Sequence, residues 1–261
     1  MSRALRRRTS AAVTRDLFDR RLRALRRDRA ERQGGDIFLL ERAFEDCLER
    51  LGGIARRFQS ALLVGCPSAE WAGRLGEYAD RVDVVSEVDG HDFGVARFDL
   101  CVAVGTFDMV NELPLALHNI RRALCPDAPL IGAFVGGNSL PALRAALIEA
   151  DRVSGRAVAR THPRIEAPAF AGLLAAAGFA MPVVDIDRVS LRYRTLADLV
   201  RDLRAMASTG VLADRPPPLT KSAARHAAMA FAAAGDGERT EEIIELINFI
   251  GWAPQNRQAA G

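Results

Sequence analysis

The first short apolar run in the chain ends in a glycine that is followed by small and polar residues. Residues 61–65 read Ala-Leu-Leu-Val-Gly, and Cys66, Pro67 and Ser68 come next. Such a run is typical of a strand buried on both faces. A nucleotide-type cofactor needs small residues at the following turn, so that backbone N–H groups can approach it. Gly65 and Cys66 are therefore candidate cofactor-binding residues, although Pro67 supplies no N–H and an ordinary strand-to-helix turn explains the segment equally well.

Two acidic residues follow the next apolar run, which covers residues 82–85. If this run is the second strand of the sheet, Glu87 would bind the ribose of a nucleoside, because a carboxylate accepts hydrogen bonds from two hydroxyl groups. If it is the third strand, Glu87 and Asp89 would instead lie near the adenine. A solvated acidic turn is the structural alternative to both.

A third apolar run, residues 98–104, ends at Gly105, which we also expect beside a cofactor. Asp108 could be an acid at the mouth of the sheet, although helix capping and simple solvation are the commoner roles of such a residue. We expect Asp99 to be structural and His162, in a predicted loop, to be a surface histidine. The sequence assigns no catalytic residue.

Composition excludes several classes of protein. The 261 residues are 49% hydrophobic and 26% charged, which is typical of a soluble globular protein and not of a disordered one. No apolar run approaches the ~18–20 residues that span a bilayer. The four cysteines contain no CxxC pair and the four histidines contain no HxxxH, so we expect no metal. The cysteines are expected to be reduced, buried and inert.

The mild net charge of +3 is unevenly placed, because arginines gather in the first thirty residues. A solvated helical arm is the simplest interpretation, and contact with phosphate, an anionic membrane surface or an acidic partner is the alternative. The first residues also resemble a mitochondrial transit peptide. The arginines in question are Arg6, Arg7, Arg8, Arg15, Arg20, Arg21, Arg23, Arg26, Arg27 and Arg29.

Hydrophobic periodicity predicts the elements that position these residues. Helical spacing and its breaks predict helices over 17–33, 37–51, 68–79, 113–124, 139–152, 166–177, 196–207 and 221–233. Short apolar or alternating runs predict strands over 61–65, 81–85, 98–104, 129–135, 183–193 and 242–250. Because strands alternate with helices, the fold class is α/β with a mainly parallel sheet and helices on both faces. We divide the chain into a basic helical extension, residues 1–53, and an α/β domain, residues 54–261.

The order of several motifs resembles the class I S-adenosylmethionine-dependent methyltransferases, and within them the complex I assembly factor 5 family. The malonyl-acyl-carrier-protein methyltransferases are more distant relatives. The resemblance implies a Rossmann-like fold, S-adenosylmethionine as cofactor and a protein substrate. The segments that carry it are 17–20 with 32–33 (FDR…RQ), 61–66 (LDLGCG), 98–100 (FDL), 110–114 (VNDLP), 120–127 (I-R-LKPDG), 136–144 (GGDTL-ELR), 177–187 (AGF…VD-D) and 249–254 (GWAP).

The chain departs from the family pattern in two places. Leu63 stands where the family has an acidic residue, and Pro67 and Ala69 stand at its later glycines. These changes weaken the expected cofactor site. The ~30 residues between Gly65 and the third predicted strand are too few for two strands and a helix, which need roughly fifty. We therefore expect one βα unit to be missing.

Three functional hypotheses follow. The first is an S-adenosylmethionine-dependent methyltransferase-like enzyme acting on a protein, such as a respiratory-complex subunit. The second is a catalytically inactive assembly factor on the same fold, which the altered first motif favours. The third, nucleic-acid binding through the arginine arm, ranks last because interleaved aromatic residues are scarce. We expect a cytoplasmic protein in a bacterium with peripheral membrane contact through the arginine-rich start, or alternatively a protein of the mitochondrial matrix.

Overall fold

The computed structural model describes residues 16–255, and the first arginines and the transit-like start lie outside this range. The helices in the described part are α1 (Arg20–Gln33), α2 (Phe38–Gly52), α3 (Glu70–Leu75), α4 (Leu113–Ala123), α5 (Pro141–Val153), α6 (Ala167–Ala176), α7 (Leu196–Ala205) and α8 (Lys221–Ala233), with one 3-10 turn, η1 (Phe107–Met109). The strands are β1 (Phe58–Val64), β2 (Ala79–Val85), β3 (Leu100–Val104), β4 (Pro129–Gly136), β5 (Ala180–Tyr193) and β6 (Thr240–Trp252).

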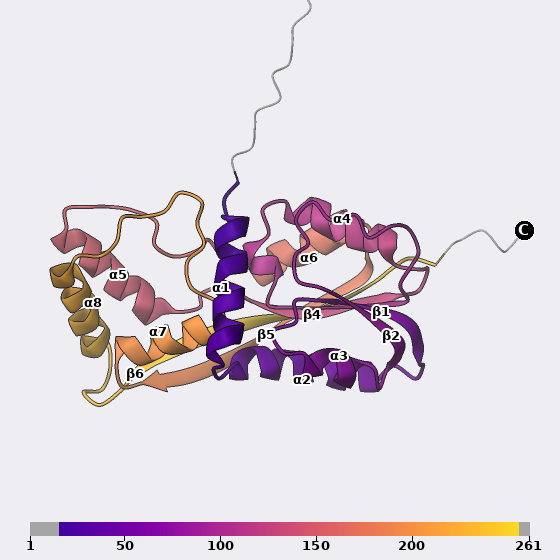
Figure 1. Ribbon diagram of the computed structural model, residues 1–261, viewed down its shortest axis with the longest axis horizontal. Helices are drawn as coiled ribbons and strands as arrows, with labels where there is room; N and C mark the ends of the chain where they lie inside the picture. The colour runs from indigo at the N-terminus through magenta and orange to yellow at the C-terminus, as the bar shows by residue number, and fades with distance from the viewer. Residues whose placement is uncertain (1–15, 256–261) are drawn as a thin grey trace, which may run out of the picture.

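The strands form one mostly parallel sheet in the order β2-β1-β3-β4-β6-β5 (Figure 1). The strands from β1 to β4 pair in parallel, and β6 runs antiparallel to both β4 and β5. After β1 the chain forms β2 on one side of it and then crosses over to form β3 on the other side. The carboxyl end of β1 is therefore the switch point at which open α/β sheets bind ligands.

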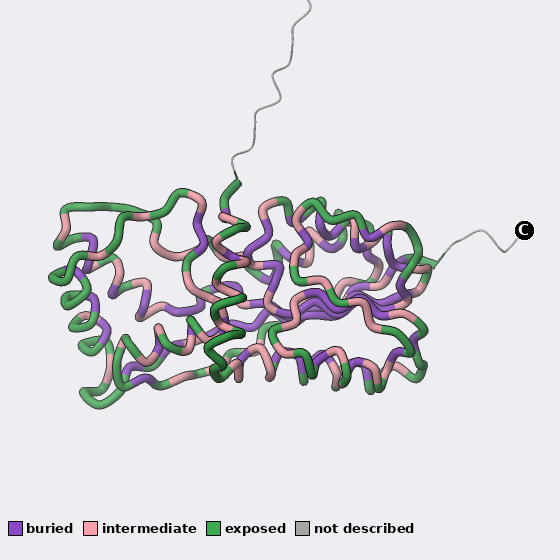
Figure 2. Tube along the Cα trace, in the orientation of Figure 1, coloured by how far each residue is buried: buried purple, intermediate pink, exposed green. Residues whose placement is uncertain are grey.

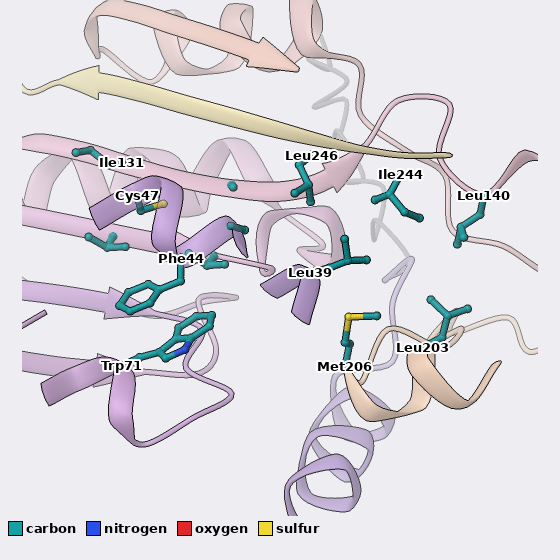
Figure 3. Close-up of a cluster of buried hydrophobic side chains, with 14 of the residues drawn as sticks. Leu39, Phe44, Cys47, Trp71, Ile131, Leu140, Leu203, Met206, Ile244 and Leu246 are labelled. Carbon is teal, nitrogen blue, oxygen red and sulfur yellow. The ribbon is translucent and has the colours of Figure 1, made fainter. Parts of the chain in front are cut away.

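Alternating side chains of the strands face two hydrophobic layers. Ala61 and Leu63 of β1 pack with α2 and α3, whereas Leu62 and Val64 pack with α4 and α6. Figure 2 shows the buried strands between these helical layers. In Figure 3, Phe44 of α2 and Trp71 of α3 lie together below the sheet, with their rings stacked at 4.2 Å. Burial on both faces explains why these strands read as continuous apolar runs.

The amino-terminal helices have different surroundings. The buried face of α2 contains Leu39, Phe44 and Cys47 and packs against the sheet. Helix α1 crosses the carboxyl edge of the strands and contacts α7 (Figure 1). The division of the chain at residue 53 stays a prediction, although α2, which precedes it, is part of the hydrophobic core.

The α/β fold with helices on both faces is confirmed. β2 pairs directly with β1, and no strand lies beyond β2 within residues 16–255, which agrees with the expected loss of one βα unit. β2 therefore takes the position of the second strand of the family sheet and not that of the third. The helix predicted over 68–79 is shorter, because it ends before Gly76 and the chain turns into β2.

Candidate functional site

A cleft of about 500 Å³ lies at the carboxyl ends of β1, β2 and β3, and we call it the outer cleft. Its sheet side contains Gly65, Cys66 and Gly105, three of the five residues predicted to bind a cofactor. Its other side is helix α1, which contributes Arg23, Arg27, Asp28, Ala30 and Glu31. This volume lies within the ~300–1,000 Å³ of small-molecule sites.

The two glycines of the outer cleft have left-handed backbone conformations. Gly65 has φ +73°, and a Cβ atom there would lie 2.3 Å from the carbonyl oxygen of Val104. Gly105 has φ +61°, and its Cβ would lie 2.7 Å from Leu40. Only glycine adopts such a conformation without strain and fits so little space. The glycines therefore let the turns after β1 and β3 pass close to their neighbours.

The turn after β1 is held by its own polar groups. The Cys66 thiol donates to the carbonyl oxygen of Ser68 at 2.9 Å, and the Ser68 hydroxyl accepts from the N–H of Glu70 at 3.3 Å. Partial burial raises the pKa of the Cys66 thiol. The expectation that all four free cysteines are buried is wrong for Cys66 and Cys125, which are half-buried because they lie in turns at the ends of secondary structure.

Glu87 is engaged by α1 and does not line the outer cleft. Its carboxylate accepts from Arg23 at 3.0 Å and from Arg27 at 3.4 Å. Arg23 also donates to the carbonyl oxygens of Met109 and Thr106, and its side chain is only 4% exposed. The role of Glu87 in nucleoside binding stays a prediction, and such binding would have to share this carboxylate with α1.

Asp89 joins α1 to the loop before α4. Its carboxylate accepts from the backbone N–H groups of Asn111 at 3.0 Å and Glu112 at 3.3 Å and lies 3.6 Å from Arg20. The side chain is 2% exposed and does not line the outer cleft. Cofactor binding by Asp89 also stays a prediction, and the contacts observed for it are structural.

The buried Arg23 is the residue that sequence reasoning missed. Arg20, Arg23 and Arg27 recur at helical spacing, so they share one face of α1, and that face meets the turns after β2 and β3. This spacing could have predicted an inward-facing row of arginines, but the many other arginines in the segment obscured it.

Behind the outer cleft lies a second cavity of about 40 Å³, which we call the inner cavity. Leu40, Gly105 and Met206 line both spaces. Its polar wall residues are Asp108, His162, Arg164 and Ser208. The inner cavity therefore joins the turn after β3 to a loop that is more than fifty residues away in the sequence.

The expected capping role of Asp108 is wrong, and the side chain is only partly exposed. Its Oδ1 atom is buried and has no hydrogen-bond partner, and α4 begins after Glu112. Burial raises the pKa of Asp108, while Arg23 and Arg164 act in the opposite direction. The alternative, an acid at the mouth of the sheet, describes its position after β3.

His162 lies less at the surface than we expected, because neighbouring segments half-bury the ring. Its Nε2 accepts from the N–H of Val211 at 2.7 Å, and the ring lies edge-on against Phe18 at 5.3 Å. Burial, assisted by Arg164, lowers the pKa of His162 to about 4. The ring is therefore neutral at pH 7.

Asp99 has the structural role that we expected. Its two carboxylate oxygens accept from the backbone N–H groups of Gln59 and Ser60, each at 2.8 Å. Within the described residues, no group of three or more His, Cys, Asp or Glu side chains could hold a metal ion. In the same part of the chain, no helix is both long and apolar enough to cross a membrane.

Comparison with known proteins gives relatives that match nearly all of this chain. The chain is 28% identical over 273 aligned residues to the protein named "Arginine-hydroxylase NDUFAF5, mitochondrial" of Danio rerio, covering 94% of this chain and 85% of the relative. The Homo sapiens protein of the same name is 26% identical with 94% and 79% coverage. A malonyl-[acyl-carrier protein] O-methyltransferase of Xylella fastidiosa is 32% identical, but the match covers 56% of this chain and 48% of that protein. No family model matches.

Solved structures show the same fold at low sequence identity. A putative methyltransferase of Bacillus halodurans superposes with a TM-score of 0.54 at 10% identity, covering 81% of this chain and 99% of that one. The YcgJ protein of Bacillus subtilis superposes with a TM-score of 0.51 at 12% identity and the same coverage. The chain is thus a homologue of the proteins named arginine-hydroxylase NDUFAF5 and has the fold of the class I methyltransferases.

Proposed function

We propose that this chain is an S-adenosylmethionine-dependent, methyltransferase-like enzyme that modifies a protein substrate during assembly of respiratory complex I. The observation that supports this most directly is the outer cleft, at the switch point of the sheet and between two glycine turns. The names of the relatives that match nearly all of this chain describe hydroxylases of arginine, which supports an arginine group as the substrate. The same names include "mitochondrial", which supports the mitochondrial alternative for location.

The residues of the outer cleft suit a nucleoside of this kind. Gly65 and Gly105 keep side chains out of the turns, and the hydroxyls of Ser68 and Ser86 offer hydrogen-bonding groups. Asp28 and Glu31 of α1 line the same cleft and would supply carboxylates for an amino group, which the apolar Leu63 does not. When bound, S-adenosylmethionine supplies an electrophilic methyl group. The contribution of the chain is then mainly to align the cofactor with its acceptor.

Calorimetric titration of the full chain with S-adenosylmethionine and S-adenosylhomocysteine tests this proposal. We expect a dissociation constant below ~1 mM, which corresponds to about −4 kcal/mol. Ala30→Trp should weaken binding at least tenfold, because Ala30 lies on the cleft side of α1. Leu25→Trp is the matched control, because Leu25 is 53% exposed on the same helix and does not line the cleft.

Absence of heat at high protein concentration, or equal weakening by both tryptophan variants, would contradict a nucleoside site in the outer cleft. The second candidate function, a catalytically inactive assembly factor on the same fold, would then be favoured. The specific observation behind it is that Arg23 and Arg27 already bind Glu87, the carboxylate expected to bind the ribose of the cofactor. Pairing of α1 arginines with the chain's own acids also leaves less positive charge for nucleic acid.

A further inference from the structure

Helix α1 forms one wall of the outer cleft, and its two halves are attached to the rest of the protein differently. Just before the helix, Phe18 is 4% exposed and packs in a small apolar cluster with Val211 and Leu212. Arg23 is the only buried residue of the helix itself. From residue 24 to residue 35, every residue is half-buried or exposed. The start of α1 is therefore anchored, whereas its second half lies on the surface.

The end of this second half, residues 27–35, is held mainly by one arginine, and we call it the cleft segment. Arg27 donates to the carbonyl oxygen of Ser86 at 2.7 Å and to the Glu87 carboxylate at 3.4 Å. Within residues 16–255, no other side chain of the cleft segment forms a hydrogen bond or ion pair with another element. A helix end with few buried apolar contacts opens locally at a low free-energy cost.

The cleft segment ends in two glycines that line the outer cleft. Gly34 follows the last turn of α1 with φ +56°, and a Cβ atom there would meet nothing within 4 Å. Gly35 lies against the end of α7, where a Cβ atom would come within 2.5 Å of the Ala205 Cβ. Glycine gives the backbone conformational freedom at residue 34, and at residue 35 it lets the segment rest directly on α7.

We propose that the cleft segment is a lid, which unwinds from Gly34 towards Arg23, releases Arg27 from Glu87 and opens the outer cleft to its ligand. The contacts of Arg27 and the close approach of Gly35 to α7 hold the lid closed. Arg23 stays in place, so the helix remains attached when the lid is open. Closure of such a lid separates a bound ligand from water. The identity of the ligand rests on the proposed function, but the movement requires no cofactor.

The Cys66 thiol is a native probe of this movement, because Cys66 lines the sheet side of the outer cleft. Alkylation of the full, reduced chain with iodoacetamide, followed by peptide mass spectrometry, measures the modification rate of each cysteine. Cys125 is the internal reference, because it is also half-buried but does not line the cleft. We expect Arg27→Met and Glu87→Gln each to raise the rate at Cys66, relative to Cys125, at least fivefold.

These two variants separate movement of the lid from electrostatics. Iodoacetamide reacts with the thiolate, so loss of a nearby positive charge should slow the reaction and loss of a nearby negative charge should accelerate it. Opening of the lid accelerates the reaction in both variants. Arg29→Met is the matched control, because Arg29 is exposed on the same helix and does not line the cleft.

Gly35→Ala tests the lid without changing any charge. The new Cβ would collide with Ala205, so the segment must move away from α7, and the rate at Cys66 should again rise at least fivefold. Gly172→Ala in α6 is the matched control, because a Cβ atom there meets nothing within 4 Å.

Three results would overturn the lid. They are an unchanged rate at Cys66 in Arg27→Met and Gly35→Ala, opposite effects of Arg27→Met and Glu87→Gln, and an equal rise at Cys125. A separate titration of the wild-type chain with S-adenosylmethionine distinguishes such a result from failure of the proposed function.

Discussion

The outer cleft and the inner cavity both contain buried charge, but they satisfy it differently. At the outer cleft, the Arg23 guanidinium donates to one carboxylate and two carbonyl oxygens. At the inner cavity, Asp108 and Arg164 each retain a buried polar atom without a partner. The first arrangement fastens α1 to the sheet, whereas the second leaves two buried polar atoms unsatisfied. The hydrogen-bond partners of a charged group therefore differ between these two places, and this difference sets its contribution to stability.

This contrast predicts opposite effects when the two charges are removed. Breaking a satisfied buried pair leaves its partners without hydrogen bonds, so the fold loses stability. Removing an unsatisfied charge relieves a desolvation penalty, so the fold gains stability.

Arg23→Met should lower the free energy of unfolding by about 3 kcal/mol, because two carbonyl oxygens lose this donor and Glu87 keeps only Arg27 as its arginine partner. Urea denaturation at pH 7 measures this change. Arg21→Met is the control on the exposed face of α1 and should change stability by less than about 0.5 kcal/mol. Equal effects of the two variants would show that the contacts of Arg23 do not fasten α1.

Between pH 6.5 and pH 4, the free energy of unfolding of the wild type should fall by about 2 kcal/mol more than that of His162→Gln. This difference is smaller than the full pKa shift implies, because solvent screens a half-buried ring. The folded pKa of His162 is about 4, below the ordinary 6.5, so the unfolded chain takes up the proton first. The stability from the neutral ring is present above pH 6.5 and is lost as the pH falls towards 4.

Urea denaturation at pH 7, 5.5 and 4 measures this difference between the wild type and the variant. The exposed His226 gives the control substitution, His226→Gln. Parallel stability curves for the wild type and His162→Gln would contradict a half-buried, neutral imidazole beside the inner cavity.

Asp108→Asn should raise the free energy of unfolding at pH 7 by about 1 kcal/mol, the smallest of the three effects. Burial raises the folded pKa of Asp108 above the ordinary 3.8. Ionisation therefore disfavours the fold as the pH rises from 3.8 through the raised pKa of the folded state. The gain should disappear below pH 3.8, where the carboxyl is protonated in both states. Asp92→Asn serves as the control, because the Asp92 side chain is 69% exposed. A loss of stability in Asp108→Asn would mean that the carboxylate has partners.

The sequence was sufficient to predict most of the framework. The strand ending at Gly65 and the helix spanning α2 follow from apolar patterns that depend only on nearby residues. The position of Gly65 and Gly105 at a ligand-binding edge also follows, because the ends of parallel strands meet there. Segment 68–79 was predicted less well, because the six-residue helix α3 is too short for a clear periodic signal.

The partners of charged side chains were beyond the reach of the sequence. Glu87 and Asp89 are held by arginines of α1, and Asp108 and Arg164 meet at one cavity although they lie 56 residues apart in numbering. Local composition alone determined the alternation of strands and helices and the turn at Gly65, because backbone preferences and burial periodicity act over a few residues. Only the tertiary structure decided which charges are paired, buried or left open, because that depends on distant segments meeting in space.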